Sequence, residues 1–254
     1  MLTVSFVQCR KDNYVWLARD SGSGEVVVID PTDAAPVMAA LDALDWRPTA
    51  VWNTHHHGDH TGGNAELKAR YGCAVFAPAA ELSDIPTADY ALQQGDVVKL
   101  GTTEAVVIDV PGHTRGHIAY HLPADRVLFC GDTLFALGCG RLFEGTAAQM
   151  WQSLQKLMEL PPQTHVYCAH EYTESNLRFA QHVMPQNEAL KRRAMQIAQT
   201  RAAGKPTVPS LLSVELATNP FLRADQPELR AALGDESQSG EVVFAMLRKM
   251  KDEF

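Results

Sequence analysis

The chain of 254 residues is 46% hydrophobic and 20% charged, which is enough apolar content to bury one large core or two modest ones. Its ordinary glycine and proline content excludes the fibrous and disordered classes. A formal net charge of −8 argues against a nucleic-acid partner, and the lack of an apolar run of about 18 residues argues against a membrane partner.

Cysteine usage indicates a reducing compartment. The five cysteines show no Cys-x-x-Cys spacing, and an odd number of cysteines cannot all form disulfides. The first ten residues also lack the basic start and the long apolar run of a secretory signal. We therefore expect a cytoplasmic protein, and we expect it to be a monomer.

The first half of the chain predicts many short strands and two helices. The first helix, from Asp33 to Leu44, has apolar positions at Val37, Leu41 and Leu44, and the second runs from Asn64 to Tyr71 and is closed by Gly72. Short runs rich in Val, Ile, Tyr and Trp predict the strands. These strands are expected at residues 2–8, 13–19, 25–30, 50–52, 74–76, 97–100, 104–110, 118–122 and 127–130.

The second half changes from strands to helices. A helix at about 147–159 and a strand at 164–168 are followed by a helical tail. The tail predicts helices at 173–184, at 187–204 with Asn187 as cap, at 227–234, and from Ser239 to the end with an apolar stripe of Val242, Met246 and Met250. The proline-rich stretch from Lys205 to Arg223 is expected to be irregular. We predict two domains, at residues 1–168 and 169–254.

The most distinctive stretch runs from Thr54 to Asn64 and contains His55, His56, His57, Asp59 and His60 within six residues. In an extended segment His55 and His57 point to one side and His56 to the other. Gly58 permits a turn that brings Asp59 and His60 to the same space. A surface tag would lack the aspartate and the preceding apolar run. The spacing therefore predicts the start of a two-metal site.

Three further candidate ligands follow apolar strands, namely His113, Asp132 and His170. Loops at strand ends commonly carry binding residues because the sheet holds them rigidly. Alone, each histidine could be an ordinary packed residue, and Asp132 could be a turn residue in Gly-Asp-Thr. The metal motif elsewhere in the chain favours a ligand role for all three.

The motif from Thr54 to His60 resembles the His-x-His-x-Asp-His motif of the metallo-β-lactamase superfamily. Further stretches resemble a narrower family, glyoxalase II, the hydroxyacylglutathione hydrolases. These stretches are Gly131-Asp132-Thr133-Leu134-Phe135, Gly138-Cys139-Gly140-Arg141, His170-Glu171-Tyr172-Thr173, Asn219-Pro220-Phe221-Leu222-Arg223 and the basic last helix. The resemblance implies an α/β fold: an αββα metallo-β-lactamase-like sandwich that binds metal, followed by a smaller all-helical C-terminal domain that binds glutathione.

The resemblance also implies the ligands of two divalent metal ions, with zinc expected ahead of iron or manganese. It places His55, His57 and His113 on one ion, Asp59, His60 and His170 on the other, and Asp132 between them. Asp59 and Asp132 are then the catalytic carboxylates. His56 and His117 are expected behind the ligands, and His121, His165 and His182 are expected to be structural.

The implied reaction is hydrolysis of S-D-lactoylglutathione to D-lactate and glutathione, the second step of methylglyoxal detoxification, by a hydroxide held between two metals. The positive charge of two divalent ions exceeds the negative charge of Asp59, Asp132 and the hydroxide together. The centre therefore keeps a net positive charge and holds hydroxide at neutral pH. A thiol with a pKa of about 8.5 departs without a strong general acid, which favours a thioester over an amide substrate.

Glutathione carries carboxylates, so its binding requires cations. Arg248 and Lys251 stand three residues apart on the last helix and can converge on one anion, although a solvated helix end explains such a pair equally well. The resemblance adds Arg141 and Tyr172 to the substrate-binding set. Phe143 departs from the tyrosine common in the family, so a hydroxyl contact is lost there. Gly58 departs from a bulkier residue, with small effects expected.

Other functions fit parts of the sequence. Another superfamily hydrolase, such as a β-lactamase, a lactonase or a persulfide-oxidising iron enzyme, would not need Tyr172, Arg248 or Lys251. A metal-stabilised binding module would have a closed, cysteine-rich site. Cys139 could be a nucleophile, but the sequence identifies no paired base.

Overall fold

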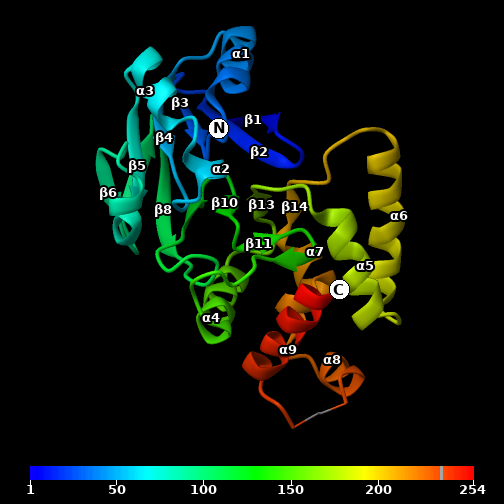
Figure 1. Cartoon of the computed structure of the whole chain (residues 1–254). Helices are drawn as coiled ribbons and strands as arrows, with labels where there is room; N and C mark the ends of the chain where they lie inside the picture. Colours follow the sequence, from blue (N-terminus) through cyan, green and yellow to red (C-terminus); the bar gives the residue numbers. More distant parts are fainter. Residues whose placement is uncertain (235–236) are drawn as a thin grey trace. The chain divides into compact units, whose positions relative to one another are not determined.

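The computed structural model describes residues 1–234 and 237–254 (Figure 1). The chain divides into two compact units. The first unit comprises Met1–Asp109 and Thr114–Gly131, and the second comprises Val110–His113 and Asp132–Phe254. No helix among the described residues is long and apolar enough to cross a lipid bilayer. All five cysteines are buried free thiols.

The first unit contains a six-stranded sheet in the order β1-β2-β3-β4-β5-β6. Its first three strands are antiparallel, and β3 to β6 are parallel. The strands are β1 (Leu2–Cys9), β2 (Asn13–Asp20), β3 (Val26–Ile29), β4 (Pro48–Trp52), β5 (Ala74–Pro78) and β6 (Tyr90–Leu92). The sequence does not predict β6, because three residues at a half-exposed sheet edge are too few to show an alternation.

A second set of four antiparallel strands in this unit follows the order β10-β9-β8-β7. These strands are β7 (Val97–Leu100), β8 (Thr103–Asp109), β9 (Ile118–Leu122) and β10 (Val127–Gly131). Strands β9 and β10 are buried along their whole length, and β10 carries the apolar run Val127–Cys130.

The helices of the first unit are α1 (Ala34–Leu44), α2 (Gly58–Thr61), α3 (Asn64–Tyr71) and the 3₁₀ helix η1 (Ala79–Asp84). Helix α1 buries Val37 and Leu41 against the sheet core, but Leu44 is exposed. The expectation for Leu44 is wrong because the helix ends there. The chain turns back at Asp45 in a left-handed conformation, and Trp46 enters the core instead.

The second unit is mainly helical. Its helices are α4 (Ala147–Met158), α5 (Thr173–Val183), α6 (Glu188–Ala202), α7 (Leu212–Thr218), η2 (Pro220–Arg223), α8 (Pro227–Ala232) and α9 (Gly240–Glu253). Its short strands are β11 (Leu134–Phe135) antiparallel to β12 (Gly138–Cys139), and β13 (His165–Cys168) antiparallel to β14 (Ser210–Leu211). The side chains of Asn187 and Ser239 cap α6 and α9 as predicted.

Two expectations for the helical tail are wrong. The stretch expected to be irregular contains α7, whose buried Leu212, Glu215 and Thr218 recur at helical spacing, and Pro220 stands at the start of η2 rather than breaking a helix. The stripe on α9 is displaced by one residue: Val242 and Met246 are exposed, whereas Val243, Phe244, Leu247 and Arg248 are buried. Both stripes have helical spacing, and contacts of Phe244 with the Trp151 and Phe221 rings select the second.

Candidate metal centre and cavity

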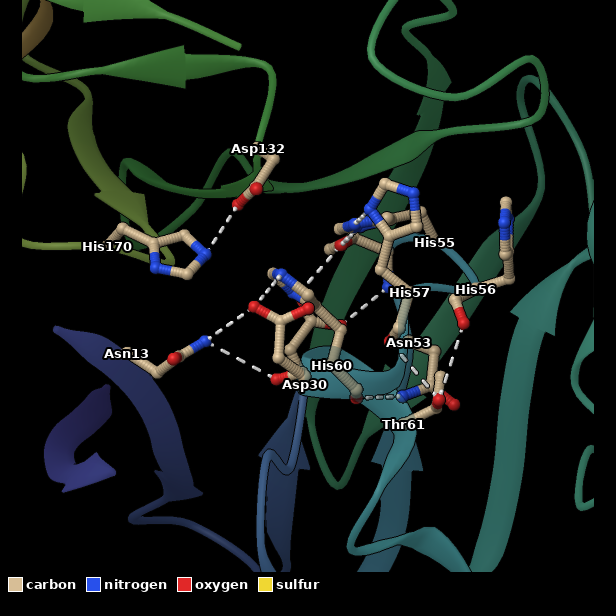
Figure 2. A network of polar contacts seen from close by, with 12 residues as sticks. Asn13, Asp30, Asn53, His55, His56, His57, His60, Thr61, Asp132 and His170 are labelled. Carbon is tan, nitrogen blue, oxygen red and sulfur yellow. Dashed lines mark hydrogen bonds and ion pairs between the residues drawn. The ribbon is translucent and has the colours of Figure 1, made fainter. Parts of the chain in front are cut away.

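The first unit gathers four of the predicted ligands at the end of β4 (Figure 2). His55 Nε2 lies 3.0 Å from His57 Nδ1, so the two rings face each other as the alternation predicts. Helix α2 then brings His60 to 4.0 Å from His55 between ring centroids, and Asp59 Oδ2 to 3.6 Å from His60 Nε2. The turn does not need a glycine, because Gly58 has no left-handed backbone conformation and a Cβ there would meet nothing within 4 Å.

Asp30, at the end of β3, determines which ring nitrogen carries the hydrogen in two of these histidines. It was not identified from the sequence. Its Oδ2 lies 3.1 Å from His60 Nδ1 and accepts the Thr54 hydroxyl proton at 2.7 Å. Because that proton is used, the Thr54 oxygen accepts from His55 Nδ1 at 3.0 Å. Both rings therefore carry their hydrogen on Nδ1 and present the lone pair of Nε2. The only sequence signal was a polar residue ending a buried strand.

Replacing Asp30 with asparagine is expected to lower metal affinity by about 10- to 100-fold. The amide would direct hydrogens toward Thr54 or His60 and remove an acceptor, so the two rings would no longer be held in the ligating tautomer. Metal content after competition with a chelator measures the effect. Asp33→Asn, which changes a half-exposed aspartate three residues on, is the matched control; equal retention by both variants would contradict the role of Asp30.

Two further histidines of the first unit, His56 and His117, lie beside the predicted ligands. The His56 backbone N–H and ring Nδ1 both contact Glu81 Oε2, at 2.7 and 2.9 Å. The buried His117 ring stacks on His55 at 4.5 Å between centroids. Gly131 is required beside it, because its φ is +47° and a Cβ would lie 2.9 Å from the His117 ring. These contacts fix the His55 ring from behind.

The second unit gathers the remaining predicted ligands around one carboxylate, Asp132, whose contact with His170 is shown in Figure 2. Asp132 Oδ2 lies 3.4 Å from His113 Nε2, and Oδ1 lies 3.4 Å from His170 Nε2. The Arg141 carbonyl lies 2.8 Å from His113 Nδ1 and can only accept, so Nδ1 carries the hydrogen and Nε2 the lone pair. Gly140 lies against the Asp132 carbonyl, where a Cβ would collide.

Both groups of side chains have the chemistry of divalent-metal ligands. In the first unit, the side chains of Asp30, His55 and His60 bring nitrogen and oxygen atoms within 4.8 Å of one another. Imidazoles commonly bind zinc or iron through one ring nitrogen while the other nitrogen donates a hydrogen bond to a carboxylate, a hydroxyl or a carbonyl. That hydrogen bond fixes the tautomer of the ring. A carboxylate between two imidazole nitrogens suits a ligand shared by metal ions. The residues fit divalent metal ions.

The second unit also contains a cavity of about 410 Å³. His113 and Asp132 line it together with all four residues predicted to bind substrate, Arg141, Tyr172, Arg248 and Lys251. The Tyr172 ring stacks on His170 at 4.7 Å, with 3° between the planes. Phe143, which also lines the cavity, is mostly exposed and packs edge-on against His113 at 5.2 Å. The cavity is therefore lined by both charged and aromatic side chains.

The cations of this cavity are held differently. Arg248 is buried and donates to the Cys139 carbonyl at 2.9 Å and to Asp252 Oδ1 at 2.8 Å, with its guanidinium over the Phe221 ring. Lys251 Nζ lies 3.2 Å from Ser175 Oγ and above two aromatic rings. Burial, followed by the nearby Arg248 guanidinium, lowers the pKa of Lys251. An anion in the cavity would relieve this repulsion.

Comparison with known proteins covers the whole chain. Residues 11–170 match the family model of the metallo-beta-lactamase superfamily, and residues 171–254 match that of the hydroxyacylglutathione hydrolase C-terminus. The hydroxyacylglutathione hydrolases of Methylococcus capsulatus and Maricaulis maris are 53% and 50% identical to this chain. The alignments cover 100% and 97% of this chain, and 99% and 96% of those proteins.

The fold is similar to that of ETHE1 from Myxococcus xanthus, with a TM-score of 0.71 and 24% identity over 98% of this chain and 90% of that one. This agrees with the predicted α/β sandwich followed by a helical C-terminal part, in which the two-residue strand β14 is an exception to an all-helical tail. The chain belongs to the hydroxyacylglutathione hydrolase family of the metallo-β-lactamase superfamily.

Proposed function

We propose that this protein hydrolyses S-D-lactoylglutathione to D-lactate and glutathione. The observation that carries the proposal is the full-length match to hydroxyacylglutathione hydrolases, 53% identical over all 254 residues. The charged cavity lined by His113, Asp132, Arg248 and Lys251 supports it, because a glutathione thioester needs both a hydrolytic centre and cations for its carboxylates.

The proposed centre holds two divalent metal ions, with zinc ahead of iron or manganese. Its ligands are those implied by the sequence: His55, His57 and His113 for one ion, Asp59, His60 and His170 for the other, and Asp132 for both. When bound, such ions activate a water molecule and polarise the thioester carbonyl. The chain prepares the ligands: Asn13 Nδ2 donates to Asp59 Oδ2 at 3.0 Å, and Asp30 and the Arg141 carbonyl fix ring tautomers.

The cavity positions the substrate through its tripeptide. Arg248, Lys251 and Arg141 offer cations for the glutathione carboxylates, and Tyr172 offers an aromatic surface. Phe143 offers packing but no hydroxyl group. The thiol leaves as a thiolate, so the chain needs no strong general acid. In this proposal residues 1–168 form the catalytic domain and residues 169–254 the glutathione-binding domain of a cytoplasmic monomer.

Turnover and metal content of the purified protein test this function. We expect two metal equivalents per chain. We also expect kcat/KM for S-D-lactoylglutathione to exceed that for a lactoyl thioester of a small neutral thiol by about 100-fold, since two charge-assisted contacts are lost with the tripeptide. Absence of turnover by metal-replete protein would overturn the proposal. Equal turnover of both thioesters, or hydrolysis of a β-lactam or a lactone instead, would favour another hydrolase of the superfamily.

A cysteine mechanism is the competing chemistry within the cavity, and Cys139→Ala tests it. Burial raises the pKa of the Cys139 thiol to about 11, despite the nearby Arg248 guanidinium, so the thiol is protonated at neutral pH and is a poor nucleophile. We expect kcat for S-D-lactoylglutathione to stay within about twofold of wild type. A loss of about 1,000-fold or more in a folded, metal-replete variant would indicate that Cys139 attacks the substrate.

A further inference from the structure

Asp252 places a carboxylate among the cations of the cavity. Its Oδ1 lies 2.8 Å from Arg248 Nη2 and 3.7 Å from Arg141 Nε. The Arg248 side chain is 5% exposed, whereas the Asp252 side chain is 41% exposed. The cation is therefore enclosed by the protein, whereas the carboxylate is in contact with solvent.

The helix itself does not favour a carboxylate at this position. Asp252 lies in the last turn of α9, where the helix dipole favours cations. The order arginine then aspartate, four residues apart, is also the less favourable one for an ion pair on a helix. The two guanidinium groups of the cavity are the partners that explain its position.

Arg248 has one fixed contact and one exchangeable contact. Nη1 donates to the Cys139 carbonyl, a backbone group of the short strand β12. Nη2 donates to the half-exposed Asp252 carboxylate. A carboxylate entering the cavity would compete with Asp252 for Nη2 and for Arg141, because both anions are planar and use the same donors. The carbonyl contact would keep Arg248 in place during the exchange.

We propose that Asp252 is an internal counter-ion, which a carboxylate of the glutathione moiety displaces from Arg248 and Arg141. This proposal rests on the proposed function for the identity of the ligand. Asp252 weakens the binding of the thioester and of the product glutathione alike, since each must replace an existing ion pair. It thereby favours release of glutathione and limits inhibition by the product.

Asp252→Asn tests the proposal, because it removes the charge and keeps the shape of the side chain. S-methylglutathione, which carries the tripeptide without a thioester, is titrated into metal-replete protein by calorimetry. We expect its Kd to fall about fivefold, and the difference from wild type to shrink as salt is raised. The KM for S-D-lactoylglutathione and the inhibition constant of glutathione are expected to fall by similar factors.

Glu253→Gln is the matched control. It removes the same charge from the next residue, which is exposed and makes no ion pair within the described parts of the chain. We expect its Kd for S-methylglutathione to stay within about 1.5-fold of wild type. Equal tightening by both variants would indicate a general charge effect and overturn the proposal.

Two further outcomes would overturn the proposal that Asp252 is a counter-ion. Weaker binding in Asp252→Asn would mean that Asp252 orients Arg248 or contacts the ligand ammonium group. Unchanged binding would mean that Asp252 does not compete with the ligand. Failure of the proposed function is distinguishable from both, because wild-type protein would then bind S-methylglutathione without hydrolysing S-D-lactoylglutathione.

Discussion

Replacing Asp132 with asparagine is expected to lower kcat/KM for S-D-lactoylglutathione by about 1,000-fold, equivalent to about 4 kcal/mol of transition-state stabilisation. Asp132 directs one oxygen to His113 Nε2 and the other to His170 Nε2, each at 3.4 Å. The amide nitrogen of asparagine is not a metal ligand, and it would donate a hydrogen to whichever imidazole nitrogen it faced. In the proposed metal centre the substitution would therefore remove a shared ligand and block a second one.

Metal analysis should accompany these kinetics. We expect Asp132→Asn to bind fewer than two metal equivalents, and Asp225→Asn, which changes an exposed aspartate in the same unit, to retain wild-type metal content and activity. The position after Gly131 is also compatible with a simple turn residue. Two bound metals and activity within tenfold of wild type in Asp132→Asn would support that turn role and contradict the ligand role.

The relative placement of the predicted ligands His55 and His57 could be predicted from the sequence, because it depends on neighbours along the chain. Alternation in an extended segment places His55 opposite His57 and turns His56 away toward Glu81. The same holds for Asn187 and Ser239, since a helix cap bonds to a backbone group only three residues on. Such contacts require no knowledge of the tertiary fold.

The groups behind the ligands could not be predicted, because they come from distant segments. Asp30 reaches Thr54 and His60 across neighbouring parallel strands, and the Arg141 carbonyl reaches His113 from 28 residues away. The prediction of the buried face of α9 is wrong for a related reason. Two apolar stripes of equal period compete on it, and only packing against residues such as Trp151 decides which is buried.

Asp252 illustrates the same limit at the cavity of the second unit. In the sequence it is an ordinary acidic residue near a helix end, four positions after an arginine. In the structure it also approaches Arg141, more than 100 residues away, and so belongs to the charge balance of the cavity. Residues that bind substrate can be suggested by a family resemblance, whereas residues that oppose binding carry no comparable signal.

Replacing Glu81 with alanine is expected to lower the midpoint of thermal unfolding by about 10 °C, from a loss of about 3 kcal/mol or more. Glu81 is buried, and each of its oxygens serves one loop. Oε2 accepts from the His56 backbone and ring, and Oε1 accepts from the Thr114 hydroxyl and, at 2.8 Å, from the Gly116 backbone. Alanine would leave the buried Thr114 hydroxyl and the part-buried donors of His56 and Gly116 without their acceptor, and a buried donor left in this way costs about 1–3 kcal/mol. Thermal unfolding followed by circular dichroism measures the loss.

Glu81→Gln and Glu66→Ala separate the acceptor role of Glu81 from a general effect of charge. Glutamine keeps one acceptor oxygen, so it should recover about half of the lost stability. Glu66 is an exposed glutamate on α3, so its removal should change the midpoint by less than about 2 °C. Because the carboxylate ties the histidine loop to the 114–116 loop, metal affinity should fall in the same order as the midpoint, alanine below glutamine below wild type. A stable Glu81→Ala variant with wild-type metal affinity would mean that water replaces the carboxylate and that the two loops are held by other contacts.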